Sequence, residues 1–291
     1  MNGRLTGRLL IVAALLCCNV LAAMEWPLSE AAMVRNFGFN DRGRPVLGTV
    51  LTGEGTVCAA DKGEIIFSRS EEDRASRLPS PLGAWSAVDH GDGLVSIYGR
   101  YMDEGRKQLP PSVDQGTPIA TAGISGWSRR EGVYFMLFDR RERRWVNASM
   151  VISPFPDSVQ PQILGVQLIN SNGRTIESAQ LRNISQGRYA IAVNAADTLL
   201  DPRGVQLAPH RINCYVNGEE AGSLSFETIS ARDGVLMVNR NGLVPARQVY
   251  GPSPAFEVGE LHFNRGQAIL EVIVQDVAGN SRSSITRTLV E

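Results

Sequence analysis

Short runs of β-branched and aromatic residues, each closed by Gly, Asn, Asp or Pro, constrain the fold of this chain more than any other feature. Clear runs lie at 63–67, 86–89, 94–98, 133–138, 188–193 and 268–274. Runs of this length and composition are typical of strands rather than helices. Helix is expected only near residues 28–35, where Ser29 can cap a short segment, and around 148–152. The sequence therefore predicts a mainly β protein.

The length of 291 residues predicts two domains. Closely spaced X-Pro steps at 153–161 favour an extended linker. We therefore place a signal peptide at 1–23, a first domain at 24–157 and a second at 158–291. In the second domain, short strands alternate with turn signals at nearly even spacing, which predicts an immunoglobulin-like β-sandwich. Its closing V-x-D-x-x-G-N pattern at 274–280 resembles the final strands of bacterial Ig-like modules.

The first 23 residues have the order of a secretory signal. Two arginines precede an apolar run at 9–16, and small residues follow up to Ala23. An uncleaved membrane anchor is one alternative, although a spanning helix needs about 20 residues. Acylation at Cys17 or Cys18 is another, which the preceding leucines disfavour. We expect the chain to be exported, to the periplasm or the cell surface.

The chain that remains after residue 23 is close to neutral. It carries 27 basic and 30 acidic side chains, a formal charge of −3. A nucleic-acid partner is not expected, because such proteins normally show a basic face. Only Cys58 and Cys214 remain. Since they lie in different predicted domains, two separate thiols are expected rather than a disulfide. The charged segment at 68–81 predicts a long exposed loop.

Five short motifs between residues 36 and 147 follow the order found in one family. The most specific is VDHGDGL at 88–94 with SIY at 96–98, which is similar to the family's "IDHGNGL…TLY". The others lie at 36–45, 54–67, 115–123 and 135–147. On these motifs the first domain resembles the lysostaphin-type (LytM-like) zinc metalloendopeptidases, which cut peptidoglycan cross-bridges. The resemblance implies a LytM-like β-sheet or barrel of the duplicated hybrid motif type.

The resemblance also implies where a zinc site would lie. The family holds zinc by two His and one Asp, with a further His near the metal-bound water. When the glycine of the first ligand motif is aligned on Gly48, these positions carry other residues: Val46, Val50, Arg100, Tyr134 and Met136. Valine and methionine have no hard donor, and an arginine opposes a bound cation. The resemblance thus implies a pseudo-peptidase with no catalytic residue, no metal and no cofactor.

Only three histidines follow residue 23, namely His90, His210 and His262, so a small shift of the alignment would not restore the ligands. His90 lies in an Asp-His-Gly-Asp-Gly segment. This pattern predicts a hairpin in which Gly91 and Gly93 take positive φ and His90 is hydrogen-bonded locally. Contact between His90 and a ligand bound in the old groove is the alternative.

Two further charged groups have both structural and functional interpretations. Asp197 and Asp201 hint at a calcium loop, but such a loop needs three or more converging carboxylates. Acids of a surface turn are therefore expected. The arginines at 140–144 could bind an anionic polymer, yet their place between two predicted strands favours a solvated hairpin tip.

Together these features predict a non-catalytic cell-envelope protein that binds peptidoglycan or regulates a cell-wall hydrolase. Non-catalytic relatives of this fold activate cell-wall amidases, and the resemblance implies that role. One alternative is an active peptidoglycan metalloendopeptidase with atypical ligands. Another is a structural adhesin or spacer in which the sandwich does the work. Membrane contact is expected only through an uncleaved signal or a lipid anchor.

Overall fold

The computed structural model describes residues 23–71, 78–104, 109–199, 204–251 and 254–291. The predicted mainly β fold is confirmed, and each of the six runs singled out above forms a strand. The predicted signal peptide up to residue 22, part of the 68–81 loop, and Asp201 lie outside the described residues. Within the described residues, no helix has the length and apolar character needed to cross a membrane.

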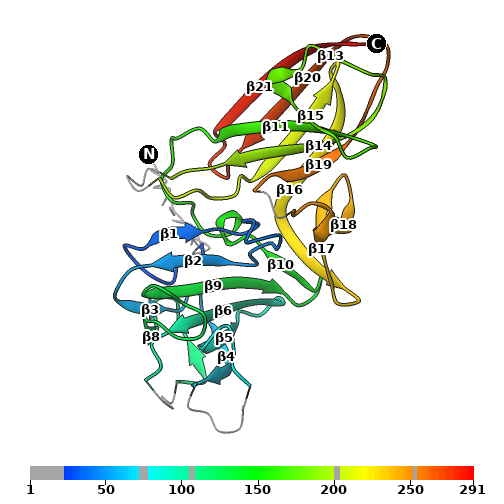
Figure 1. Ribbon diagram of the computed structural model, residues 1–291. Helices are drawn as coiled ribbons and strands as arrows, with labels where there is room; N and C mark the ends of the chain where they lie inside the picture. The colour runs from blue at the N-terminus through cyan, green and yellow to red at the C-terminus, as the bar shows by residue number, and fades with distance from the viewer. Residues whose placement is uncertain (1–22, 72–77, 105–108, 200–203, 252–253) are drawn as a thin grey trace, which may run out of the picture.

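The N-terminal unit is built around one antiparallel sheet with the strand order β1-β2-β9-β6-β5-β4-β7 (Figure 1). A separate ladder joins β3 and β8. The elements are β1 (Ala32–Arg35), β2 (Thr49–Thr52), β3 (Thr56–Cys58), β4 (Gly63–Arg69), β5 (Ala84–Asp89), β6 (Leu94–Tyr101), β7 (Ser112–Val113), β8 (Pro118–Thr121), β9 (Gly132–Asp139), β10 (Arg144–Val146) and the 3-10 turn η1 (Ala148–Met150).

The helix expected at 28–35 is wrong, because β1 occupies its second half. Met33 pairs with Leu51 of β2, and both side chains are buried. Sheet pairing at this edge outweighs the local helix propensity, which is a weak preference. The helix expected at 148–152 is present only as a single 3-10 turn, η1, which is capped by the Asn147 side chain.

The C-terminal unit is a sandwich of two sheets. One sheet has the order β12-β11-β14-β19, and the facing sheet contains β21-β20-β15-β16 with β13, β17 and β18. The elements are β11 (Gln162–Asn170), β12 (Thr175–Glu177), η2 (Ser178–Gln180), β13 (Asn183–Ile184), β14 (Gly187–Ala196), β15 (Arg211–Val216), β16 (Glu219–Arg232), β17 (Val235–Arg240), β18 (Leu243–Pro245), η3 (Ala246–Gln248), β19 (Phe256–Phe263), β20 (Gly266–Gln275) and β21 (Ser281–Val290).

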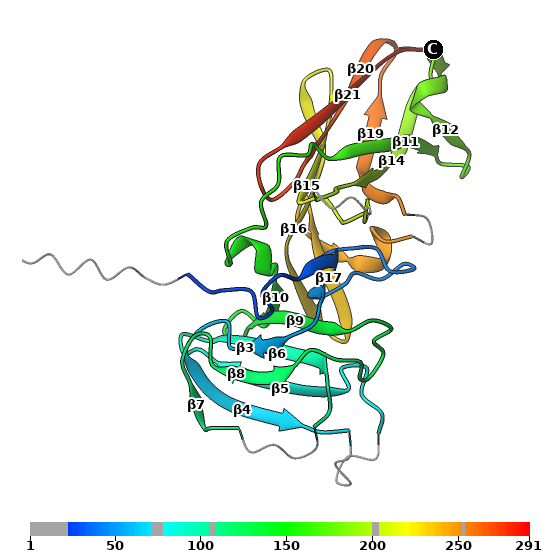
Figure 2. The same cartoon turned by 90° about the vertical axis from the view of Figure 1, so that its left-hand side faces the viewer.

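The two units are joined through their sheets as well as through the linker. The long strand β16 extends past the sandwich and pairs with β10, so that one sheet runs through both units (Figure 2). The two hydrophobic cores also exchange residues. Phe37 lies in the core of the sandwich, whereas Leu207 lies in the core of the N-terminal unit. The cores therefore do not divide the chain at a single point.

Candidate functional site

Strands β2 and β9 bring three of the positions that the resemblance assigns to ligands onto one face. Val50 is directly opposite Tyr134 in the antiparallel pair. Tyr134 and Met136 are two residues apart on β9, so they point to the same side of the sheet. A Cβ on Gly48 would clash with the Met136 side chain and lie 3.1 Å from Cε2 of Tyr134. We call Gly48, Val50, Tyr134 and Met136 the β2–β9 face.

Arg100 covers this face from the neighbouring strand β6. Its guanidinium carbon lies 4.5 Å from the centroid of the Tyr134 ring, a cation–π contact. Burial lowers the pKa of Arg100; the nearby Arg35 lowers it too, while Tyr134 and Asp41 act in the opposite direction. Burial likewise raises the pKa of Tyr134, against the influence of Arg100.

Val46 lies outside the strands that carry these residues. Its backbone pairs with Gly38 and Phe39 in the turn before β2, where Val46 N–H donates to the Phe39 carbonyl at 3.0 Å. Val50, Arg100, Tyr134 and Met136 thus lie on or beside the β2–β9 face, and Val46 lies in the turn that precedes β2.

The residues on this face do not fit a zinc ion. Met136 is buried with 7% of its surface exposed, and Gly48 packs directly on it. Aliphatic and thioether side chains supply no hard donor, and the remaining cation, Arg100, opposes a second one.

His90 lies in the predicted hairpin and is fully engaged. Gly91 and Gly93 have φ of 76° and 87°, as their place in the turn predicts. The two ring nitrogens of His90 lie 2.7 Å from the Lys62 carbonyl and 2.7 Å from Ser96 Oγ. With both nitrogens occupied, the local hydrogen-bonded role accounts for this histidine, and no contact with the β2–β9 face is recorded.

The basic cluster forms the hairpin tip that the sequence predicts, between β9 and β10. Its arginines pair with acids of this tip and of the β5–β6 turn: Arg140 with Asp89, Arg141 with Asp92, and Arg144 with Asp139. Such exposed pairs contribute little stability. The two cysteines are free as expected, Cys214 buried and Cys58 half-buried.

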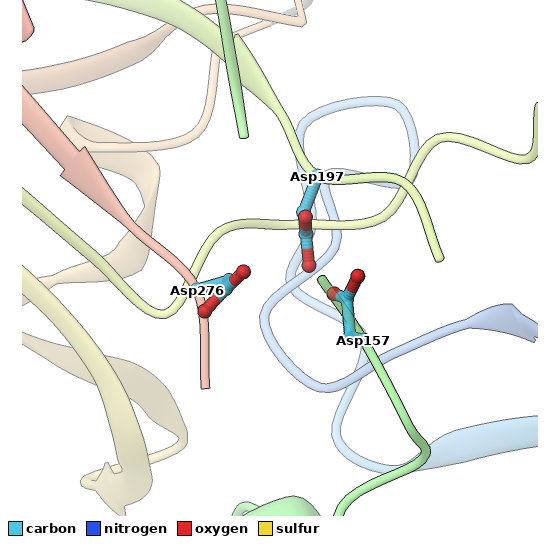
Figure 3. Close-up of side chains that lie close together, drawn as sticks. All are labelled: Asp157, Asp197 and Asp276. Atoms are coloured by element: carbon cyan, nitrogen blue, oxygen red, sulfur yellow. The ribbon is translucent and has the colours of Figure 1, made fainter. Parts of the chain in front are cut away.

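A second group of polar side chains was not predicted. Asp157 of the linker, Asp197 after β14 and Asp276 after β20 place carboxylate oxygens within 4.8 Å of one another (Figure 3). Among the described residues, this is the one group of three or more His, Cys, Asp or Glu close enough to hold a metal ion. The expectation that Asp197 is a surface-turn acid is wrong, because only 6% of it is exposed.

Burial and neighbouring charges perturb the ionisation of Asp197 and Asp157. Burial is the largest of the causes that raise the pKa of Asp197 to about 7, and the charges of Asp276 and Asp157 contribute to the same shift. Burial is also the main cause that raises the pKa of Asp157. Asn280 restrains the group, since its side-chain amide donates to Asp276 at 2.8 Å and to the Asp157 carbonyl at 3.4 Å. Three carboxylates form a donor set for a hard cation such as Ca²⁺.

The sequence offered a signal for this triad, although a scattered one. Asp157 ends the proline-rich linker and Asp276 is the acid of the V-x-D-x-x-G-N pattern. Asp157 and Asp276 lie 119 positions apart, and only the sandwich topology makes them neighbours. The calcium-loop hypothesis paired Asp197 with Asp201, four residues away, because short spacing is the one kind of proximity that a sequence shows. Asp201 lies outside the described residues.

The comparisons with known proteins give limited similarity. A protein-family model matches residues 160–291, which comprise the sandwich. No curated protein matches the chain significantly. Among solved structures, similarity is found to a chain of the pore-forming SpoIIQ–SpoIIIAH complex. The sequence identity is 17%, the match covers 45% of this chain and 90% of that chain, and the TM-score is 0.36. The solution structure of lysostaphin matches with 14% identity, 74% and 85% coverage and a TM-score of 0.36.

A third match is the catalytic domain of the prophage-encoded protein EnpA from Enterococcus faecalis. Its identity is 22%, it covers 40% of this chain and 88% of that chain, and its TM-score is 0.34. None of these three TM-scores reaches 0.5. The functional proposal below therefore rests on the residues of this chain.

Proposed function

We propose that this chain is a non-catalytic, LytM-like protein of the cell envelope that binds peptidoglycan through its N-terminal unit. The observation that carries the proposal is the β2–β9 face. There the positions that the resemblance assigns to the family's ligands carry Val50, Tyr134 and Met136, and the guanidinium of Arg100 stacks on Tyr134. Valine and methionine supply no hard donor, and a single phenol does not make up the three-ligand set that holds a catalytic zinc, the ion that activates water and polarises the scissile carbonyl. Binding without cleavage is the function that this arrangement supports.

The stem peptides of peptidoglycan are the class of ligand that we favour. They carry several carboxylates, and Arg100 places a positive charge beside the β2–β9 face. The ordered motifs between residues 36 and 147 support the same choice, because the family that they resemble acts on peptidoglycan peptides. A cell-wall hydrolase as the partner is the alternative, and it predicts binding to a protein and not to purified sacculi.

Export belongs to the same proposal. The signal-like order of the first 23 residues supports a location beyond the inner membrane, where peptidoglycan lies. The V-x-D-x-x-G-N pattern supports an Ig-like relationship for the sandwich. Fractionation of cells that express the full chain tests the location: the mature protein should appear outside the cytoplasm and begin near residue 24.

Co-sedimentation with purified sacculi tests the proposed function. The protein that begins at Met24 should pellet with sacculi, release no soluble muropeptides and contain no stoichiometric zinc. Muropeptide release that a chelator abolishes would establish the metallopeptidase alternative. Capture of a purified hydrolase without sedimentation on sacculi would establish the regulatory alternative.

A further inference from the structure

One carbonyl oxygen connects Arg100 to an exposed tryptophan. The Pro81 carbonyl accepts hydrogen bonds from Arg100 Nε at 3.3 Å and from the Trp127 backbone N–H at 3.2 Å. Two segments that are far apart in the sequence, the end of β6 and the loop before β9, therefore meet at Pro81. This junction adjoins the β2–β9 face, because the same guanidinium stacks on Tyr134.

The backbone of Arg100 is held in an unusual conformation. Its φ is 67°, in the left-handed region that L-residues other than Gly, Asn and Asp rarely adopt. Its N–H donates to the Leu82 carbonyl at 2.7 Å, which holds the residue in that conformation. A strained, partly buried cation that is fixed on three sides is typical of a site that positions a side chain for a ligand.

The guanidinium still has donors to offer. Nε is engaged with Pro81, and the ring of Tyr134 covers one face of the group. Within the described part of the chain, neither terminal nitrogen of Arg100 has a hydrogen bond or an ion pair. The edge formed by these two nitrogens matches the two oxygens of a carboxylate.

Exposed apolar side chains lie in the loop whose Trp127 N–H meets the Pro81 carbonyl. Trp127 is 74% exposed and Ile124 is 64% exposed. Gly126 and Gly83 approach so closely that a Cβ on either would meet the backbone of the other, and Ser125 Oγ accepts from the Ala84 N–H at 3.1 Å. A preorganised loop that presents a large aromatic side chain is the kind of anchor found at the centre of binding sites.

The charges around this junction favour an anionic ligand. Arg35 is close enough to Arg100 to lower its pKa. Asp41, the nearest acid to act on Arg100, is already paired with Arg35 at 3.0 Å. Arg35 and Arg100 together outweigh Asp41, which complements a carboxylate and opposes a metal ion. Two exposed arginines, Arg129 and Arg130, follow two and three residues after Trp127. The carboxylate of Glu71, which accepts from the Gly126 N–H at 2.8 Å, offsets part of their charge.

We infer that Arg100 and Trp127 form a carboxylate-binding site for a short peptide. The terminal nitrogens of Arg100 bind one carboxylate in bidentate fashion, and the Trp127 indole packs on the apolar part of the peptide next to it. The inference rests on the proposed function, since it names the chemical group through which a stem peptide would be held. Where the zinc proteins of the resembled family bind a cation, this chain presents a site for an anion.

Calorimetric titration of the protein from Met24 with synthetic stem tetrapeptides tests this inference. One peptide carries all its carboxylates free, and the others have each carboxylate amidated in turn. Amidation at one position should weaken binding about tenfold or more, since it removes a charged pair of hydrogen bonds. Arg100→Gly should weaken binding of the free peptide equally and abolish the effect of that amidation. Trp127→Ala should weaken the binding of all the peptides alike.

Matched variants keep the result interpretable. Glycine suits the φ of residue 100 and Trp127 is mostly exposed, so both variants should fold, as circular dichroism would verify. Arg287→Gly and Leu164→Ala remove an exposed arginine and an exposed apolar side chain from the sandwich and should leave binding unchanged. Equal affinity for every amidated peptide, or an amidation effect that survives in Arg100→Gly, overturns the inference while peptide binding stands. Absence of binding to peptides and sacculi alike refutes the proposed function itself.

Discussion

Asn36 exchanges two hydrogen bonds with the backbone of Ala208, 172 positions further along the chain. Asn36 Nδ2 donates to the Ala208 carbonyl and the Ala208 N–H donates to Asn36 Oδ1, both at 2.7 Å. The Asn36 side chain thereby satisfies the backbone N–H and carbonyl of Ala208, which lies before β15, as a neighbouring strand would. It joins the N-terminal unit to the sandwich at a buried position, since Asn36 is only 8% exposed.

Substitution of this asparagine should weaken the whole molecule. Asn36→Ala leaves the N–H and the carbonyl of Ala208 buried without partners, which should lower the free energy of unfolding by about 2 to 4 kcal/mol. Urea unfolding followed by tryptophan fluorescence measures this. Asn172→Ala, in the exposed turn after β11, is the control and should have no measurable effect. Equal stability of the two variants would show that the contact does not couple the units.

The strands could be predicted from the sequence because their alternation and their turn residues are local. The His90 hairpin is the clearest case, since two glycines and an Asp-Gly step define it completely. The convergence of Val50, Tyr134 and Met136 came from the family resemblance and not from periodicity. What stacks on Tyr134 could not be predicted, because it depends on the positive φ of Arg100 and on the hydrogen bond to Pro81.

The joining of the two units was equally hidden from the sequence. A proline-rich linker indicates a boundary between two domains. Phe37, which precedes this linker, nevertheless packs in the sandwich core, and β16, which follows it, pairs with β10. Residue type marks Phe37 as buried but does not show in which core. The acidic triad has the same origin, because its members become neighbours only through long-range strand pairing.

The inability of the β2–β9 face to bind zinc can be tested by introducing His and Asp at the positions that the resemblance assigns to zinc ligands. The wild-type protein should retain no zinc above background after dialysis, as measured by elemental analysis. The variant with Val46→His, Val50→Asp, Tyr134→His and Met136→His should bind about one equivalent, because it restores three or four hard donors on neighbouring strands. Failure of this variant to bind zinc while it remains folded would contradict the alignment on Gly48.

The strain at Arg100 predicts an unusual tolerance of substitution at that position. Arg100→Gly relieves a left-handed backbone worth about 1 kcal/mol and loses a cation–π contact of similar size. The melting temperature should therefore change by less than about 4 °C. Gly48→Ala is the contrasting variant, since its Cβ would clash with Met136, and it should lose about 1 to 3 kcal/mol of stability. Equal effects of the two would disprove the assignment of strain.

The acidic triad predicts that stability falls as the pH rises. The pKa of Asp197 is about 7 in the folded protein and has an ordinary value of 3.8. Between these values the folded protein holds a proton that the unfolded chain has released, so unfolding becomes easier as the pH rises, and the loss is complete above pH 7. With EGTA present, the melting temperature should decrease from pH 5 to pH 8.

Asp197→Asn should remove this slope and melt above the wild type at pH 8, because an amide carries no charge to repel Asp157 and Asp276. Asp92→Asn, at a fully exposed side chain, is the matched control and should keep the slope. A slope that is present in EGTA and absent in millimolar calcium would identify a bound cation as the counter-charge in place of the proton. A wild-type melting temperature that is constant from pH 5 to pH 8 in EGTA would refute the raised pKa of Asp197.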